Sequence, residues 1–359
     1  MFVHYYAMIS EMSKNEKLVL NGLVAFPDLN DQHLAAKLGL RYSTFCTVRK
    51  KLRDRDYYST VKIPIIQRLG AEMFAVIYTE FNPAISVGER AEITRNTVEV
   101  FDELVYSVGE THKGFSLNIA RNYSDICRIN DIRIGTFAKA GILDRQHPTA
   151  VQFPFYLSHI PRFLDYAPVL ASKTGFDLPR DLPMGMPSDS RPVELTASEK
   201  KVMYGLVSNP EMNDRELANH LGMSRHIISR SRKKMESENL IIRKRIPNML
   251  KLGFKVMTLS HIRFNPRKPL DDALLASGVL QDPATILLAT RKYDCIAISA
   301  YLDYEDYRQM HTPMVQYLKE NDYLAEMPET SKYMIPCMVT MKDIAFGPIV
   351  RKILAIDGE

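Results

Sequence analysis

The side chains of this 359-residue chain that are best suited to contacting another molecule stand at the start of two short, basic segments. Both segments are predicted to be helices, one over residues 42–57 and the other over residues 224–239. Arginine and lysine pair with phosphate oxygens, and arginine, serine and threonine can form hydrogen bonds with base edges in a nucleic-acid groove. The two segments therefore predict a surface that binds nucleic acid.

Positive charge is concentrated around these two helices. Residues 30–72 contain nine lysines and arginines against four acids, and residues 213–255 contain eleven against four. The two windows together carry about +12, whereas the whole chain carries +5, so the remainder is acidic. A solvated helix face could explain one basic run. Two matched runs favour a phosphate-binding surface on an otherwise acidic scaffold.

The elements that position these helices occur twice, because the chain contains an internal repeat with one offset of 183 residues. A period this long excludes a solenoid and predicts a duplicated pair of domains. The matched segments include Glu16-Lys17 with Glu199-Lys200, Leu38-Gly39 with Leu221-Gly222, Ile63-Pro64 with Ile246-Pro247, and Phe81-Asn82-Pro83 with Phe264-Asn265-Pro266.

The first part of each copy predicts three helices, of which the basic helix is the third. Apolar residues recur at helical spacing over residues 16–26 and 199–208. The second helix begins at Asn30 or Asn213, both favourable N-caps, and Glu216 follows Asn213 at the spacing of a capping box. A glycine ends each second helix. Helix, glycine-containing turn and basic helix are typical of a helix-turn-helix.

The second part of each copy predicts alternating strands and helices, after β-prone segments at residues 58–65 and 240–246 that suit a wing. In copy one the order is strand 73–81, helix 88–100, strands 104–110 and 115–120, helix 125–140 and strand 151–157. In copy two the equivalents are 256–264, 270–277, 286–290, 295–301, 307–319 and 333–341. This βαββαβ order is typical of a ferredoxin-like domain of RAM or ACT type. The predicted fold class is therefore α+β, with two copies of a winged helix-turn-helix followed by a ferredoxin-like domain.

A proline-rich segment separates the two copies and predicts an extended linker, or alternatively a rigid arm packed on one half. The predicted domains are winged helix-turn-helix 1 over residues 1–70, ferredoxin-like domain 1 over 71–170, the linker over 171–193, winged helix-turn-helix 2 over 194–253, and ferredoxin-like domain 2 over 254–359.

Short motifs in both copies carry a family resemblance. In copy one they are Leu34-Ala35, Leu38-Gly39, Ser43-Thr44, Lys50-Lys51-Leu52 and Leu69-Gly70, and in copy two Leu217-Ala218, Leu221-Gly222-Met223-Ser224, Arg230, Lys233-Lys234-Met235, Ile241 and Leu252-Gly253. Together with the βαββαβ order, the chain resembles a tandem form of the Lrp/AsnC (feast/famine) transcription regulators. The resemblance implies that the sheet domains pair and place two helix-turn-helix units on DNA, so one chain would form an intramolecular pseudo-dimer.

The resemblance also implies which residues contact DNA. Base edges would be contacted by Arg41, Tyr42, Ser43, Thr44 and Thr47 in copy one and by Ser224, Arg225, His226, Ser229 and Arg230 in copy two. Phosphates would be contacted by Lys50, Lys51, Lys233 and Lys234, and by the wing residues Arg243, Lys244 and Arg245. Copy one has a less basic wing and Arg41 where the family usually caps with serine. Copy two is therefore expected to bind more tightly.

Two turns depart from the family pattern and leave alternatives open. The family shows a Gly-x-x-Asp-type turn near its amino-acid effector site, whereas this chain has His112-Lys113-Gly114-Phe115 and Arg291-Lys292-Tyr293-Asp294. The identity of any small-molecule effector therefore stays open. Siroheme decarboxylases share this architecture and use histidine and arginine near the same turn on an anionic tetrapyrrole, although their longer His-Asn-Tyr run is absent here. A non-catalytic, protein-binding adaptor is the third hypothesis.

Composition excludes several other classes. The four cysteines lie far apart without a Cys-x-x-Cys motif, which argues against a zinc site and a disulfide framework. There is no long apolar stretch, glycine-rich phosphate loop or His-Glu-x-x-His motif. Because the first residues lack a basic region, we do not expect them to form a secretory signal. We therefore expect a cytoplasmic, sequence-specific regulator of transcription that binds double-stranded DNA, is not an enzyme, and has no cofactor, metal or membrane partner. The aromatic N-terminal segment leaves room for a homodimer.

Overall fold

The computed structural model describes residues 9–98, 101–143, 147–179, 185–187, 191–271, 274–275 and 278–356. The chain divides into two compact units, and each unit combines segments of both copies. Unit 1 consists of Met1–Thr60, His159–Met186 and Arg243–Pro336, and unit 2 of Val61–Ser158, Pro187–Ile242 and Cys337–Glu359. Each unit therefore contains the helix-turn-helix of one copy and the sheet domain of the other.

The helix-turn-helix of unit 1 consists of α1 (Lys14–Ala25), α2 (Asp31–Lys37) and α3 (Tyr42–Asp54). Ser13 and Glu16 form a capping box at the start of α1, and the Asn30 side chain caps α2. These caps satisfy amide groups that have no partner within the helix. α3 packs inward through Phe45 and Leu52, both fully buried.

The helix-turn-helix of unit 2 repeats this arrangement with α7 (Ala197–Ser208), α8 (Asp214–Leu221) and α9 (Arg225–Ser237). The capping box predicted at Asn213 and Glu216 is confirmed. Gly205 allows close approach of α7 and α8, because an added Cβ would lie 2.8 Å from a Leu221 methyl carbon. The equivalent glycine of α1, Gly22, has the same relation to Leu38, at 2.6 Å.

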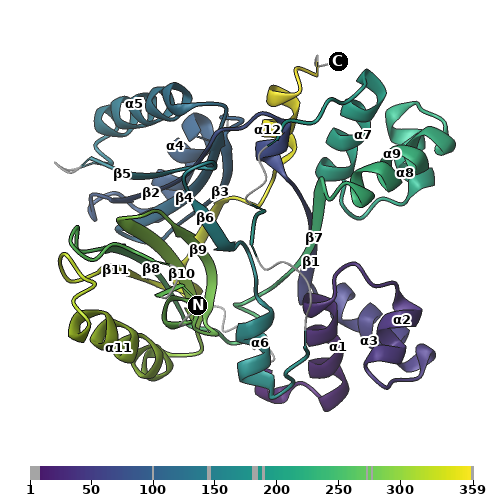
Figure 1. Cartoon of the computed structure of the whole chain (residues 1–359), viewed down its shortest axis with the longest axis horizontal. Helices are drawn as coiled ribbons and strands as arrows, with labels where there is room; N and C mark the ends of the chain where they lie inside the picture. Colours follow the sequence, from purple (N-terminus) through teal and green to yellow (C-terminus); the bar gives the residue numbers. More distant parts are fainter. Residues whose placement is uncertain are drawn as a thin grey trace. The chain divides into compact units, whose positions relative to one another are not determined.

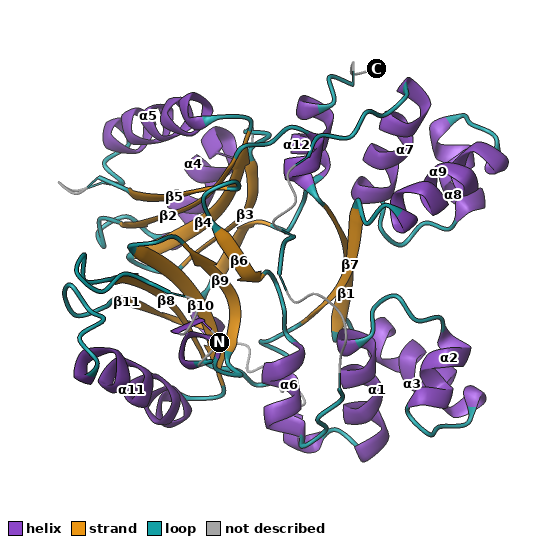
Figure 2. Ribbon diagram, viewed as in Figure 1, coloured by secondary structure: helices purple, strands orange, loops and turns teal. Residues whose placement is uncertain are grey.

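Each unit contains a five-stranded antiparallel sheet with helices on one face (Figures 1 and 2). In unit 2 the order is β12-β3-β4-β2-β5, formed by Val339–Lys342, Leu104–Gly109, Lys113–Ala120, Met73–Glu80 and Thr149–Pro154, with helices α4 (Val87–Val98) and α5 (Tyr123–Lys139). In unit 1 the order is β11-β8-β10-β9-β6, formed by Glu329–Met334, Val256–Arg263, Asp294–Tyr301, Thr285–Thr290 and His159–Arg162, with α11 (Tyr304–Glu320). These elements agree with the α+β fold class predicted from the sequence.

The fifth strand of each sheet comes from the other copy. β6 follows ferredoxin-like domain 1 in the chain but pairs with β9, and β12 ends the second copy but pairs with β3. A short helix follows each exchanged strand, α6 (Ala167–Thr174) in unit 1 and α12 (Gly347–Ile353) in unit 2. α6 contacts α1, and α12 contacts α7 (Figure 1). The exchanged strand and helix thus connect the helix-turn-helix to the sheet within each unit.

The strands β1 (Tyr58–Pro64) and β7 (Ile241–Pro247) occupy the segments predicted as wings. The chain passes from one unit to the other within each strand. In unit 2 the Ile65 amide donates to the Leu240 carbonyl at 2.8 Å, and in unit 1 the Asn248 amide donates to the Tyr57 carbonyl at 2.8 Å. The two bonds are related by the repeat offset, so the same local contact is formed twice.

Three predicted segments differ from the structure or lie partly outside the described residues. The single strand predicted over residues 333–341 is wrong: β11 ends at Met334 and β12 begins at Val339, because Pro336 between them cannot donate to a ladder. α6 extends to Thr174, inside the segment predicted as a linker. The helix predicted over 270–277 lies largely outside the described residues. No helix in the described ranges is long and apolar enough to cross a membrane.

The packing of α12 generates a stability prediction. Ile349 is fully buried on this helix, whereas the Arg351 side chain is 46% exposed and pairs with Asp102. We expect Ile349→Ala to lower the free energy of unfolding by about 2–5 kcal/mol. Arg351→Ala should lower it by less than about 1 kcal/mol, because solvent screens the exposed pair. Chemical denaturation followed by circular dichroism measures both values, and equal effects would contradict the packing described for α12.

Candidate functional site

The third helix of each helix-turn-helix presents its predicted contact residues to solvent. On α3 the exposed residues are Arg41, Tyr42, Ser43, Thr47 and Lys50, and Thr44 is half-buried. On α9 the exposed residues are Ser224, Arg225, His226, Arg230 and Lys233, and Ser229 is half-buried. Ser224 caps α9 by accepting from the Ile227 amide, whereas Arg41 provides no side-chain cap for α3. The start of α9 is therefore the better fixed of the two.

Other cations on the same helices form ion pairs within their own unit. Lys51 pairs with Glu16 at 2.6 Å in unit 1, and Lys234 pairs with Glu199 at 2.9 Å in unit 2. At the start of the second helix of each motif, Asp31 pairs with Arg49 of α3, and Asp214 pairs with Arg232 of α9. Both pairs recur at the repeat offset of 183. They fasten the third helix to the first and second helices, which is a structural role.

Partial burial would by itself raise the pKa of Glu16. Hydrogen bonds from Lys51 and from the backbone and side chain of Ser13 outweigh that effect and lower the pKa to about 2. The pKa of Glu199 is also lowered, first by its hydrogen bond from Lys234. Both carboxylates therefore remain ionised in the folded protein at mildly acidic pH, and they keep their lysines in place.

The three predicted wing residues of copy two lie in unit 1, next to α1 rather than α9. Lys244 and Arg245 are buried, and Arg245 donates through Nη1 to the Leu23 carbonyl at 2.9 Å. Burial raises the pKa of the nearby Asp28, against the opposing charges of Arg243, Arg245 and Lys244. Because buried side chains cannot reach a phosphate, Lys244 and Arg245 are not carried into the DNA surface proposed below.

A second group of polar residues lies on the sheet of unit 1, at one end of β8 and β10. We call it the His261 cluster, formed by His261, Arg263, Arg291 and Asp294. His261 Nε2 lies 3.7 Å from Asp294 Oδ2, and Arg291 Nε donates to Asp294 Oδ1 at 2.8 Å. Arg263 Nη2 lies 3.4 Å from His261 Nδ1. The strand register pairs Asp294 with Arg263, which brings residues far apart in sequence together.

Charged groups of both signs surround His261. Burial would raise the pKa of Asp294, but the neighbouring His261 and the hydrogen bonds from Arg291 lower it to about 2. The nearly buried His261 lies beside this ionised carboxylate. Arg263 pairs with Glu326 and with Glu329, all three about half exposed, so a ligand carboxylate can replace these weak pairs. Arg263 can therefore hold a ligand carboxylate close to the His261 imidazole.

The sequence singled out Arg291 but missed His261 and Asp294. His261 lies near the end of β8, and its only signal in the sequence is that it shares a sheet face with Arg263 two residues later. His112, which the sequence also singled out, is exposed in unit 2. There the turn contains Glu110 and Lys113, paired at 3.2 Å, in the positions of Arg291 and Asp294. Copy one therefore reverses the charges of this pair.

No group of three or more histidine, cysteine or acidic side chains within the described ranges could hold a metal ion. Cys295 lies in the core of unit 1, and burial raises the pKa of its thiol. A thiol with a raised pKa is a poor nucleophile at neutral pH. The His261 cluster and the two third helices are therefore the sites whose chemistry bears on function.

Neither a family model nor a curated protein matches the chain. Among solved structures, siroheme decarboxylase NirDL is similar over 96% of this chain and 99% of its own, with a TM-score of 0.51 and 11% identity. NirDL in co-complex with an iron-uroporphyrin III analogue gives a TM-score of 0.52 and 12% identity over the same shares. An AsnC family transcriptional regulator from Agrobacterium tumefaciens matches 39% of this chain and 90% of its own, with a TM-score of 0.33 and 17% identity.

The full-length similarity shows a shared fold of winged helix-turn-helix and ferredoxin-like domains. It also corrects one prediction. The expectation that the chain is not an enzyme is wrong, because the structures that match over nearly its whole length are those of a decarboxylase. The AsnC-type regulators match 39% of the chain. The tandem Lrp-like architecture holds at the level of the fold.

The lowered pKa of Glu16 generates a pH prediction. Its folded pKa of about 2 lies below the ordinary value of 4.5. Its contribution to stability is therefore complete above about pH 4.5 and is lost as the pH falls towards 2. Glu16→Gln should lower the free energy of unfolding by about 0.3–1 kcal/mol at pH 7, and the difference from the unchanged chain should vanish near pH 2. Denaturation at several pH values tests this, with exposed Glu11→Gln as the control that shows no such difference.

Proposed function

We propose that the chain is a siroheme-decarboxylase-like enzyme that removes carbon dioxide from a carboxylate side chain of an anionic tetrapyrrole. The observation that carries the proposal is the His261 cluster, in which a histidine lies between the Asp294 carboxylate and Arg263, and Arg291 donates to the same carboxylate. The full-length similarity to NirDL supports it, because the shared fold belongs to a decarboxylase.

The cluster supplies the groups that such a reaction needs. Decarboxylation breaks the bond between the side-chain carbon and the carboxylate, carbon dioxide leaves, and the carbon takes a proton in its place. Arg263 would hold the substrate carboxylate in exchange for its exposed acidic partners. His261 would donate the proton as a general acid. Asp294, itself fixed by Arg291, would orient the imidazole.

The test is incubation of the purified chain with siroheme, followed by mass spectrometry of the tetrapyrrole. We expect product that has lost carbon dioxide, and His261→Gln should lower the rate by about 10²–10⁴-fold, the usual contribution of general acid catalysis. His112→Gln is the matched control, because this exposed histidine lies at the equivalent turn of copy one, and its rate should not change. Absence of both tetrapyrrole binding and product would contradict the proposal.

A second candidate function, compatible with the first, is DNA binding by the helix-turn-helix units. The observation that favours it is a set of exposed cations on α3 and α9. These cations are distinct from Lys51 and Lys234, which form ion pairs with the first helix of each motif. Arg225, Arg230 and Lys233 are exposed on α9, against Arg41 and Lys50 on α3. Together with the Ser224 cap, this favours tighter binding by copy two.

Fluorescence anisotropy on DNA from the upstream region of the chain's own gene, titrated with salt, tests DNA binding. About six to ten phosphate contacts give a log–log salt slope steeper than about −5. Arg230→Ala with Lys233→Ala should weaken binding more than Thr47→Ala with Lys50→Ala, the same positions in copy one. If the chain fails to bind at low salt, the DNA candidate is excluded, whereas the decarboxylase assay is unaffected.

A further inference from the structure

A small cavity lies beneath α4 and α5 in the sheet domain of unit 2. Its volume is about 30 Å³, which suffices for about two waters or one small ion. The polar groups that line it are two guanidinium groups and four hydroxyls, from Arg90, Arg133, Thr79, Thr94, Ser107 and Ser116. None of the lining residues is acidic.

Both arginines of this cavity are buried, and each has one guanidinium nitrogen without a hydrogen-bond partner among the described residues. Arg90 is fully buried and donates to the Thr111 carbonyl at 2.6 Å and to the Glu110 carbonyl, but its Nε has no partner among the described residues. Arg133 is 4% exposed and donates through Nη1 to Ser116 Oγ at 3.3 Å, while Nη2 has no partner there. A buried charge without a counter-ion is strongly unfavourable.

The charge around Arg133 is not balanced by the protein. Within the described residues, no carboxylate lies within ion-pair distance of it. Burial lowers the pKa of this guanidinium to about 10, which still leaves it charged at neutral pH. Glu110 lies near Arg90, but its carboxylate pairs with Lys113 at 3.2 Å. The cavity therefore carries excess positive charge together with donors.

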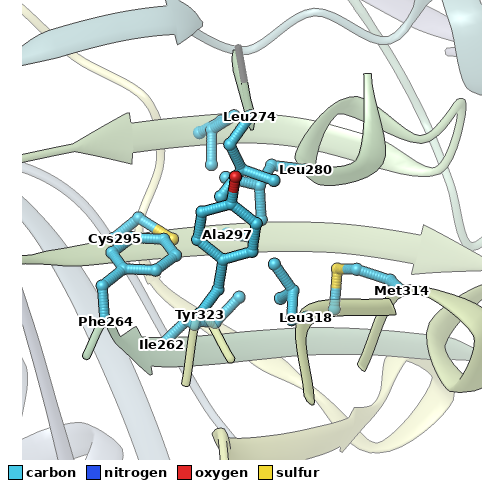
Figure 3. Close-up of a cluster of buried hydrophobic side chains, with 10 residues drawn as sticks. Ile262, Phe264, Leu274, Leu280, Cys295, Ala297, Met314, Leu318 and Tyr323 are labelled. Carbon is cyan, nitrogen blue, oxygen red and sulfur yellow. The ribbon is translucent and has the colours of Figure 1, made fainter. Parts of the chain in front are cut away.

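The second copy shows what this site looks like without polar groups. β10 begins at Asp294 where β4 begins at Lys113, and α11 begins at Tyr304 where α5 begins at Tyr123. By this register Arg133, Ser116 and Ser107 correspond to Met314, Ala297 and Leu288, and Thr79 corresponds to Ile262. All four belong to one apolar core cluster (Figure 3). The same position in the fold is thus apolar in unit 1 and cationic in unit 2.

We propose that the cavity of unit 2 is a binding site for a small monovalent anion, the size of a halide ion or a one- or two-carbon carboxylate. Arg133 Nη2 and Arg90 Nε hold the anion, and the hydroxyls of Ser107, Ser116, Thr79 and Thr94 complete its shell. An ordinary core would be as apolar as its counterpart in copy two. The site is separate from the His261 cluster and does not depend on either proposed function.

The test compares the thermal midpoint of the full chain in gluconate, which is too large for the cavity, with that in bromide or acetate at equal ionic strength. At ten times the dissociation constant, the anion should raise the midpoint by about 3–6 °C. Bromide anomalous scattering from a crystal should place one ion between Arg90 and Arg133. Equal midpoints in gluconate, bromide and acetate would overturn the proposal.

Variants separate this site from general salt effects. Ser116→Ala with Arg133→Met rebuilds the pair that packs as Ala297 and Met314 in copy two, so it should fold and lose the anion-dependent rise. Arg128→Met is the control, because Arg128 is a half-exposed arginine on the same helix and should keep the full rise. If the double variant keeps the rise, or if Arg128→Met abolishes it, the anion binds elsewhere and the assignment is wrong.

Discussion

The structure depends on a reciprocal exchange in which each copy completes the sheet of the other. A cation at the same position of each exchanged strand fixes it. Arg162, at the end of β6, is buried and donates to the Gln281, Asp282 and Thr285 carbonyls, the last at 2.9 Å. Lys342, at the end of β12, donates to the Phe101 carbonyl at 3.2 Å. Carbonyl oxygens bonded to a charged donor make strong hydrogen bonds, so both strands are held where they leave the sheet edge.

The exchange has a consequence for the helix-turn-helix units. Because α6 and α12 follow the exchanged strands directly, each docks on the first helix of its own copy. Asn21 of α1 donates to Thr174 Oγ1 at 2.8 Å in unit 1. In unit 2, Lys352 of α12 pairs with the buried Glu103, which also pairs with Arg128 at 3.1 Å. The position of each helix-turn-helix on its sheet domain therefore depends on residues about 150 positions away in the chain.

The sequence predicted local features well and long-range pairing poorly. The repeat, the capping box at Asn213 and most strands of the two ferredoxin-like domains follow from spacing and propensity within short windows. The exchange of β6 and β12 leaves no local signal, because either sheet edge could accept either strand. The His261 cluster could not be predicted for the same reason, because only the register of β8 and β10 brings His261 close to Asp294. The burial of Arg245 could not be predicted either, because in the sequence it is simply one of three consecutive basic residues.

Fusion of the two copies in one chain removes the requirement that equivalent positions remain identical. Arg291 and Asp294 in unit 1 correspond to Glu110 and Lys113 in unit 2, with the charges reversed. Two identical subunits could not make such a change at one site without making it at both. In the decarboxylation proposed above, this asymmetry would restrict the histidine-dependent step to one copy, because a carboxylate substrate would meet Glu110 rather than arginine at the other turn.

The buried arginines show how positive charge is distributed between structure and ligand binding in this chain. Arg162 and Arg245 each donate to backbone carbonyls that are fixed in their own unit, and Arg90 does so through both terminal nitrogens. Their charge stabilises tertiary contacts, and it contributes nothing to a surface. Arg133 differs, because among the described residues its side chain bonds only to a serine hydroxyl. A net charge counted along the sequence therefore overstates the surface available to DNA, and it conceals a cation that the fold leaves for a ligand.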